Sequence, residues 1–404
     1  NLIGQVAVTT AIDYGLATFV NILMNQWWGT STSPQAVMVT FTCCLALHAV
    51  MNILGVRLVA LLNDVSVWWH IVVVLMFVFF LAIKAPVHNV GAAFHHTFTS
   101  SGFPYWYGFL LGFLLAQYTI TGFDASAHMS EETIGADKRA PWGIVMSVVV
   151  SAIFGYLLLM ALVVAIPSVP GKDELARLTG LSGGNPVGLI LNSALGVNLG
   201  TFLLALAVVA QFYCGMSSVT SNSRMIYAFS RDGALPLSQI WHSLNKRTRT
   251  PANAAILGAC LSWLLALPSL KSATAYAAAT SIAVIGLFLS YIIPVYLRRR
   301  AGTNIRTGSW HLGRYSRLIS GIAIAWVAFI TILFMLPTAY PINNAITFNY
   351  TPIVVLGTLA VLTVWYLVSV RFWFKGPQAQ GNATQLARIE HDLGEEVGVE
   401  LAPA

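Results

Sequence analysis

The sequence predicts an all-α integral membrane protein with ten transmembrane helices. Of its 404 residues, 57% are hydrophobic and only 9% are charged, and the mean hydropathy is +0.74. Soluble globular proteins carry about 25% charged residues, so this chain has too few charges to cover a surface in water. The charged residues are grouped between long apolar runs, and the alternating pattern of a transmembrane β-barrel is absent.

The apolar runs give the predicted helices in order. A helix needs roughly 20 mostly apolar residues to cross a hydrocarbon layer about 30 Å thick. The runs that satisfy this requirement are residues 1–24, 36–55, 62–83, 106–130, 142–167, 196–222, 252–268, 274–297, 317–336 and 350–373. The seventh is the shortest, because Pro251 and Pro268 bound it. We therefore expect one transmembrane domain over residues 1–373 and a C-terminal tail over residues 374–404.

The basic residues predict how the helices are oriented. If residue 1 lies on the cytoplasmic side, 17 of the 21 Lys and Arg residues fall in cytoplasmic intervals. Such an excess is typical of cytoplasmic loops. Since an even number of spans returns the chain to its starting side, we expect both ends to be cytoplasmic in a multi-pass protein of the plasma membrane. The net charge of +7 is then explained by topology, and no nucleic-acid partner is expected.

Acidic residues inside the predicted helices are candidates for function, because a charge within the bilayer is costly. Only Asp13 and Asp124 lie well inside a span. Asp124 belongs to a polar stretch, residues 117–133, in which Gly122 offers a point where the helix could unwind. Backbone groups freed at such a break can contact a substrate or an ion near the middle of the membrane. The alternative is a kinked helix in which Asp124 bonds to a neighbouring span.

Three stretches of the sequence form a specific pattern when they are taken together and in their order along the chain. They are NLIGQ at residues 1–5, TGFDASAHMSEE at residues 121–132 with PWGI at residues 141–144, and SR at residues 223–224 with YAFSRDGALP at residues 227–236. These stretches resemble the third, sixth and eighth helices of amino acid permeases in the amino acid–polyamine–organocation (APC) superfamily. The second stretch is especially similar to the amino acid/choline branch, which includes GABA permeases.

The resemblance implies a fold and a function. Residues 1–373 would be family helices 3–12 of the inverted-repeat fold of the leucine-transporter type, without the first two helices. The first of those carries the Gly-rich stretch that binds the substrate's carboxylate. The implied function is secondary active import of amino acids or GABA, by symport with protons. Choline or polyamines are the alternative substrates, and a channel is the alternative class of protein.

The resemblance also implies roles for particular residues. The unwound segment that contacts substrate would comprise Gly122, Phe123, Asp124, Ala125 and Ser126, with Phe123 as a lid. A cytoplasmic gate would form from Glu131 and Glu132 with the basic residues Arg139, Arg224 and Arg231. Solvated charges at the loop edge are the alternative interpretation of this second group.

Two residues are candidates for proton coupling. His70 lies 15 residues after Gly55, where some proton-coupled relatives carry a lysine in place of a bound cation, and a histidine titrates near neutral pH. Asp13 is the second candidate. The alternative for His70, which follows Trp68 and Trp69, is an ordinary packing or interfacial role.

Neither an enzyme nor a bound cofactor is expected. The sequence contains no GxxxxGK[ST] phosphate loop and no HExxH zinc motif. No set of metal ligands is predicted. The partners that the resemblance implies are the lipid bilayer, a small amino acid substrate and protons.

Overall fold

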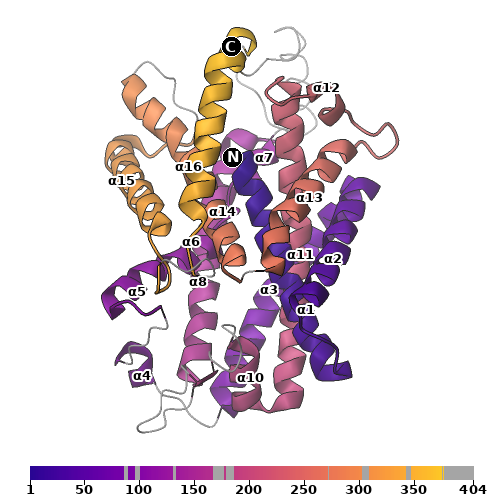
Figure 1. Ribbon diagram of the computed structural model, residues 1–404, viewed down its shortest axis with the longest axis vertical. Helices are drawn as coiled ribbons and strands as arrows, with labels where there is room; N and C mark the ends of the chain where they lie inside the picture. Colours follow the sequence, from indigo (N-terminus) through magenta and orange to yellow (C-terminus); the bar gives the residue numbers. More distant parts are fainter. Residues whose placement is uncertain are drawn as a thin grey trace.

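The computed structural model describes residues 1–85, 90–95, 101–130, 133–166, 177–178, 186–271, 273–302, 309–342, 347–374 and 376. Within these ranges every regular element is a helix, and nine helices are long and apolar enough to cross a membrane. Figure 1 shows them gathered in one elongated bundle. The prediction of an all-α membrane fold is confirmed. Of the predicted C-terminal tail, only residues 374 and 376 belong to the described part.

The long helices follow the chain in the predicted order. They are α1 (Leu2–Trp28), α2 (Pro34–Leu54), α3 (Val56–Lys84), α8 (Ala136–Val164), α11 (Val197–Arg231), α13 (Ala252–Ala266), α14 (Ala273–Ala301), α15 (Ser316–Met335) and α16 (Thr351–Trp365). A 3-10 turn (Leu267–Leu270) extends α13, and a π-helical turn (Tyr366–Val370) joins α16 to α17 (Arg371–Trp373). The shorter helices are α4 (Val90–His95), α10 (Val187–Leu195) and α12 (Ser238–Trp241).

The fourth predicted span, residues 106–130, is not one helix. It comprises α5 (Tyr105–Leu111), α6 (Phe113–Thr119) and α7 (Ala125–His128). The span is therefore interrupted at the glycine that the sequence marks as a point where the helix could unwind. The physical reason is the backbone of Gly122, whose φ of 103° is incompatible with a right-handed helix and strained for any residue with a side chain.

The turn between α1 and α2 shows how local sequence sets the helix ends. Gly29 ends α1 in the left-handed conformation, with φ 66°, and its N–H donates to the carbonyl of Asn25. Ser33 then begins α2, because its hydroxyl accepts a hydrogen bond from the N–H of Ala36 at 3.3 Å. Pro34 occupies the first helical position, where no N–H is needed. The two helices consequently lie side by side (Figure 1).

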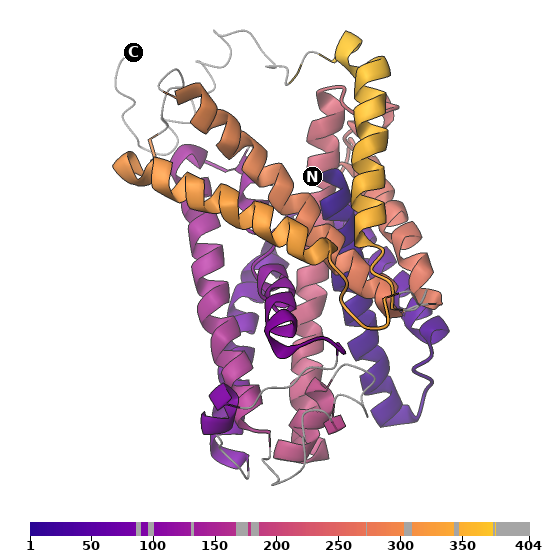
Figure 2. The same ribbon diagram turned by 60° about the vertical axis from the view of Figure 1, so that its left-hand side comes forward.

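Helix α1 is the centre of the bundle. It packs against α2, α11, α13 and α14, and α2, α11 and α13 also pack against one another. Thirteen of the 27 residues of α1 are buried, whereas α8 has no buried residue. Helices α14 and α15 run side by side and cross the rest of the bundle at a marked tilt (Figure 2). Polar residues on α1 are therefore enclosed by protein.

Candidate functional site

The broken segment between α6 and α7 leaves backbone groups outside the regular helical hydrogen-bond pattern. Only short-range bonds bridge the interruption: the N–H of Thr121 donates to the carbonyl of Tyr118, and the N–H of Ala125 donates to the carbonyl of Gly122. A Cβ atom built on Gly122 would have no described heavy atom within 4 Å. Free space therefore lies beside the break, where a ligand can approach the main chain.

Asp124 follows this break and is almost completely buried, with 5% of its surface exposed. Its Oδ2 atom accepts a hydrogen bond from Nε2 of Gln5 on α1 at 2.6 Å. The same oxygen lies 2.9 Å from Nε2 of His128, one turn later. Its Oδ1 atom has no hydrogen-bond partner among the described residues. The hydroxyl of Tyr291 on α14 also interacts electrostatically with the Asp124 carboxyl group.

Phe123 packs against aromatic residues of α14. Its ring centroid lies 5.0 Å from that of Tyr291 and 5.8 Å from that of Phe288. Such tilted or edge-to-face contacts fix the orientation of the rings. Phe123, the residue predicted as a lid, therefore connects the broken segment to α14.

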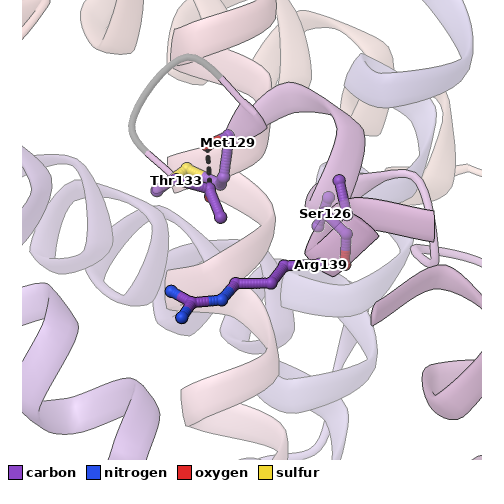
Figure 3. Close-up of a pocket in the computed structure, with 6 residues that line it drawn as sticks. Ser126, Met129, Thr133 and Arg139 are labelled. Carbon is purple, nitrogen blue, oxygen red and sulfur yellow. Dashed lines mark hydrogen bonds between the residues drawn. The ribbon is translucent and has the colours of Figure 1, made fainter. Parts of the chain in front are cut away.

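Ala125 and Ser126 face a pocket of about 330 Å³ between the broken segment and α8, which Met129, Thr133 and Arg139 also line (Figure 3). Ser126 lies close to α8, because a Cβ atom on Gly143 would come within 2.8 Å of its hydroxyl oxygen. The predicted substrate-binding residues are thus distributed between two faces of the segment. Asp124 is directed toward α1, and Ser126 is directed toward α8.

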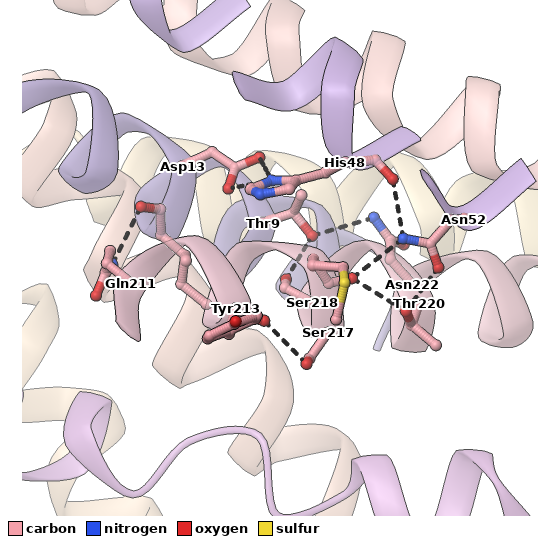
Figure 4. A network of polar contacts seen from close by, with 12 residues as sticks. Thr9, Asp13, His48, Asn52, Gln211, Tyr213, Ser217, Ser218, Thr220 and Asn222 are labelled. Atoms are coloured by element: carbon pink, nitrogen blue, oxygen red, sulfur yellow. Dashed lines mark hydrogen bonds and ion pairs between the residues drawn. The ribbon is translucent and has the colours of Figure 1, made fainter. Parts of the chain in front are cut away.

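A second polar cluster lies deeper, between α1, α2 and α11 (Figure 4). Its centre is a contact between Asp13 and Nδ1 of His48, at 3.1 Å from Oδ1 and 3.2 Å from Oδ2. Both side chains are fully buried. Gly215 of α11 makes room for the pair, since a Cβ atom there would lie 2.5 Å from Cε1 of His48. The His48 ring also packs on Phe212, with 4.5 Å between centroids.

A row of polar side chains on α1 runs from one cluster to the other. Gln5, Thr9 and Asp13 are spaced by four residues and share one face of the helix. The hydroxyl of Thr9 lies 2.8 Å from that of Ser218, and Nδ2 of Asn222 donates to Thr9 at 3.4 Å. Thr9 is buried, and these bonds join it to two residues of α11 (Figure 4).

The structure does not bring His70 to Asp124. His70 Nδ1 contacts the carbonyl oxygen and hydroxyl of Ser66 at 2.7 and 3.2 Å, one turn earlier on its own helix. No contact between His70 and Asp124 is present among the described residues. Helix α3, which carries His70, packs on α2, α8, α10 and α11.

The predicted gate residues are only partly placed. Glu131 and Glu132 lie outside the described residues. Arg139 lines the pocket of Figure 3, and Arg224 is buried on α11. Arg231 lies at the end of the same helix, and its Nε atom is 3.5 Å from Oδ1 of Asp232.

The sequence did not assign roles to Gln5, His48 and His128. The spacing of Asp124 and His128 by four residues is a signal that would have paired them on one helical turn. The spacing of Gln5, Thr9 and Asp13 is a second such signal. The pairing of Asp13 with His48 joins two helices, and no periodicity within one segment reveals it.

The comparisons agree with this architecture. A family model described as amino acid permease matches residues 1–359. The chain is 39% identical over 397 residues to the amino-acid permease BAT1 of Arabidopsis thaliana, covering 93% of this chain and 75% of that protein. It is 39% identical over 396 residues to a BAT1 homologue from Oryza sativa subsp. japonica, with the same coverage of 93% and 75%. It is also 27% identical over 296 residues to a putative polyamine transporter of Candida albicans, covering 72% of this chain and 52% of that protein.

The family match and the long apolar helices identify a multi-pass membrane transporter of small molecules and not an enzyme. The resemblance drawn from the three sequence stretches is confirmed at the level of the family. The chain belongs to the amino acid permease family of the APC superfamily.

Proposed function

We propose that this permease imports amino acids or GABA across the plasma membrane by symport with protons. Its substrate would bind at the broken segment, in contact with Gly122, Phe123, Asp124, Ala125 and Ser126. Both ends of the chain would be cytoplasmic, as the distribution of basic residues indicates. Residues 1–373 would form the transport domain, and residues 374–404 would form a cytoplasmic tail.

The observation that carries the proposal is the environment of Asp124. Its carboxyl group is buried, one of its oxygens has no hydrogen-bond partner among the described residues, and the helix break beside it leaves free space. A buried carboxylate is stabilised by a cation that donates hydrogen bonds. The ammonium group shared by amino acids and GABA meets this requirement, while main-chain groups of the break remain available for other polar atoms of the substrate.

Alternating access would involve movement of the broken segment relative to α1 and its neighbours. The basic residues Arg139, Arg224 and Arg231 would contribute to the cytoplasmic gate with Glu131 and Glu132. His70 and Asp13 are the coupling candidates that the sequence supplies. Asp13 is in contact with His48, which makes it part of a titratable pair.

A polyamine is the second candidate substrate. The observation that favours it is the similarity to a protein named a putative polyamine transporter. A polyamine also carries ammonium groups that Asp124 would accept. Choline is the other alternative substrate that the sequence resemblance implies. Its quaternary ammonium group donates no hydrogen bond, so it would have to rely on the Phe123, Phe288 and Tyr291 rings.

An uptake screen tests these alternatives. Cells that express the open reading frame would be given labelled GABA, neutral and cationic amino acids, putrescine and choline, at two external pH values. The proposal predicts saturable uptake of an amino acid or GABA that increases at acidic external pH. If only putrescine or only choline showed saturable uptake, that compound would be the substrate instead of an amino acid or GABA. Flux that does not saturate would favour a channel.

A further inference from the structure

Two carboxylate–histidine pairs occur among the described residues, and they differ in their access to water. Asp13 and His48 are both fully buried between long helices. In the other pair, the side chain of Asp124 is 6% exposed and that of His128 is 15% exposed. This second pair belongs to the segment in which the helix is broken. It can therefore exchange a proton without separation of the central helices.

His128 lines a pocket of about 350 Å³ together with Ser130, Arg224, Tyr227 and Arg249. A water molecule occupies about 30 Å³ in the liquid, so this pocket has room for several. The pocket lies on the side of the bundle that the basic residues assign to the cytoplasm. The imidazole of His128 thus stands between a solvent-accessible pocket and the buried carboxyl group of Asp124.

Gln5 joins this pair to α1. Its Nε2 atom donates to Oδ2 of Asp124 at 2.6 Å and lies 3.3 Å from Nε2 of His128. An amide nitrogen only donates, while an imidazole nitrogen donates or accepts according to its protonation. When Nε2 of His128 carries a proton, it donates to Asp124. When that nitrogen has no proton, it can accept from Gln5. The position of one proton therefore decides which contacts hold the segment to α1.

The pair has two charge states that matter for transport. With a neutral imidazole and an ionised carboxylate it is negative. With one further proton it is neutral overall, either as imidazolium and carboxylate or as imidazole and carboxylic acid. Moving an uncompensated negative charge through the interior of a membrane protein is costly. Protonation therefore favours movement of the segment that carries the pair.

We propose that Asp124 and His128 together form the proton-binding site of this permease, and that Gln5 connects the protonation of this site to the position of the broken segment against α1. This inference rests on the proposed function and names its coupling site. His128 is then the residue that exchanges the proton with the pocket, and Gln5 is a positioning residue.

Other titratable and charged groups face this site from the elements around it. Arg224, Tyr227 and Arg249 share the pocket of His128. Tyr291 of α14 interacts with Asp124. From α8, Arg139 lines the pocket on the other face of the segment. A measured pH dependence must therefore be assigned by substitution of His128 itself.

The test compares four histidine variants of the permease in liposomes. His128→Gln keeps a hydrogen-bonding side chain but cannot carry a proton, and His70→Gln and His48→Gln remove the competing candidates. His242→Gln is the matched control, because His242 lies on the short connection after α12 and contacts the carbonyl of Ser238, one turn earlier. An inward gradient of about one pH unit can support accumulation of about tenfold for one proton per neutral substrate, without a membrane potential.

The expected result is about tenfold accumulation by wild type and by His242→Gln, and equilibration without accumulation by His128→Gln. Substrate exchange at equal pH should be retained by His128→Gln. Accumulation by His128→Gln equal to that of wild type would overturn the inference. It would also be overturned if His70→Gln or His48→Gln lost proton-driven accumulation while His128→Gln retained it. A wild-type protein that does not respond to the gradient would instead overturn proton symport in the proposed function.

A second measurement does not depend on transport. Infrared spectra of the purified wild-type protein during a pH titration should show a histidine or carboxyl band that is absent in both His128→Gln and Asp124→Asn. Identical titration spectra for wild type and His128→Gln would contradict the proposed site, even if the variant were too unstable for transport assays.

Discussion

The Nδ1 atom of His48 lies 3.1 Å from Oδ1 of Asp13, and neither side chain has any exposed surface. This contact joins α2 to the middle of α1, in the most enclosed part of the bundle. Removal of one partner from such a pair leaves the other charge buried and uncompensated. The pair therefore makes these two helices depend on each other for stability.

His48→Leu should lower the free energy of unfolding by about 3–5 kcal/mol, because it leaves the Asp13 carboxyl group without this partner. The double variant with Asp13→Leu should recover most of that loss, since neither charge is then buried. Thermal unfolding followed by size-exclusion chromatography would measure both. Equal stability of His48→Leu and wild type would show that the pair contributes nothing to the fold.

Gly215→Ala should also destabilise the protein, by about 1–3 kcal/mol, because the added methyl group overlaps the Asp13–His48 pair. Gly357→Ala on α16 is the matched control. A Cβ atom there meets no described heavy atom within 4 Å, and alanine favours a helix over glycine by about 1 kcal/mol. The same unfolding assay compares the two, and a neutral Gly215→Ala would mean that the network of Figure 4 can rearrange.

The membrane architecture could be predicted from the sequence because lipid imposes a length and a composition on each helix. The limits of α2 and α13, for example, fall within a few residues of the predicted spans 36–55 and 252–268. Gly122 was also identified as a point where the helix could unwind, and the helix is interrupted there. The interruption at Gly112, between α5 and α6, was not predicted, because nothing distinguishes that glycine from one inside a continuous helix.

The candidate site was less accessible to prediction, because its contacts join residues far apart in the chain. Asp124 was identified from its charge, since charged residues are costly in a membrane, and from the resemblance. Its partner Gln5 is 119 residues away, and Asp13 is 35 residues from His48. His70 was favoured from the resemblance, but its side chain bonds to its own helix. Only packing in three dimensions determines which polar groups meet.

Gly122→Ala should reduce transport without abolishing insertion into the membrane. The backbone at Gly122 has a φ of 103°, and such a conformation costs about 1–3 kcal/mol for a residue with a side chain. This cost corresponds to a loss of about 5- to 150-fold in the population of the broken helix, and we expect transport to fall in proportion. Gly155→Ala on α8 is the control, because its methyl group would make an ordinary 3.5 Å contact with Thr119. Initial uptake rates, normalised to the amount of protein at the cell surface, would compare them.

If the uptake rate of Gly122→Ala equalled that of Gly155→Ala, the helix break would not belong to the substrate site. In that case the left-handed glycine would serve only the packing of α6 and α7.

Reporter fusions test the proposed orientation. A reporter placed after Lys375 should be protected inside the cell, and one inserted in residues 338–349 should be accessible from outside, because 17 of the 21 basic residues would then face the cytoplasm. Accessibility to a reagent that does not cross membranes would measure this. An external reporter after Lys375 would reverse the orientation.

The most direct test of the proposed function compares the transport of labelled amino acid or GABA by Asp124→Asn and by wild type in liposomes. This substitution keeps the shape of the side chain but removes the negative charge that would bind the substrate's ammonium group. We predict that wild type concentrates the substrate under an inward proton gradient, and that Asp124→Asn loses both this accumulation and exchange at equal pH. Transport by Asp124→Asn at the wild-type rate, with unchanged affinity, would contradict the account.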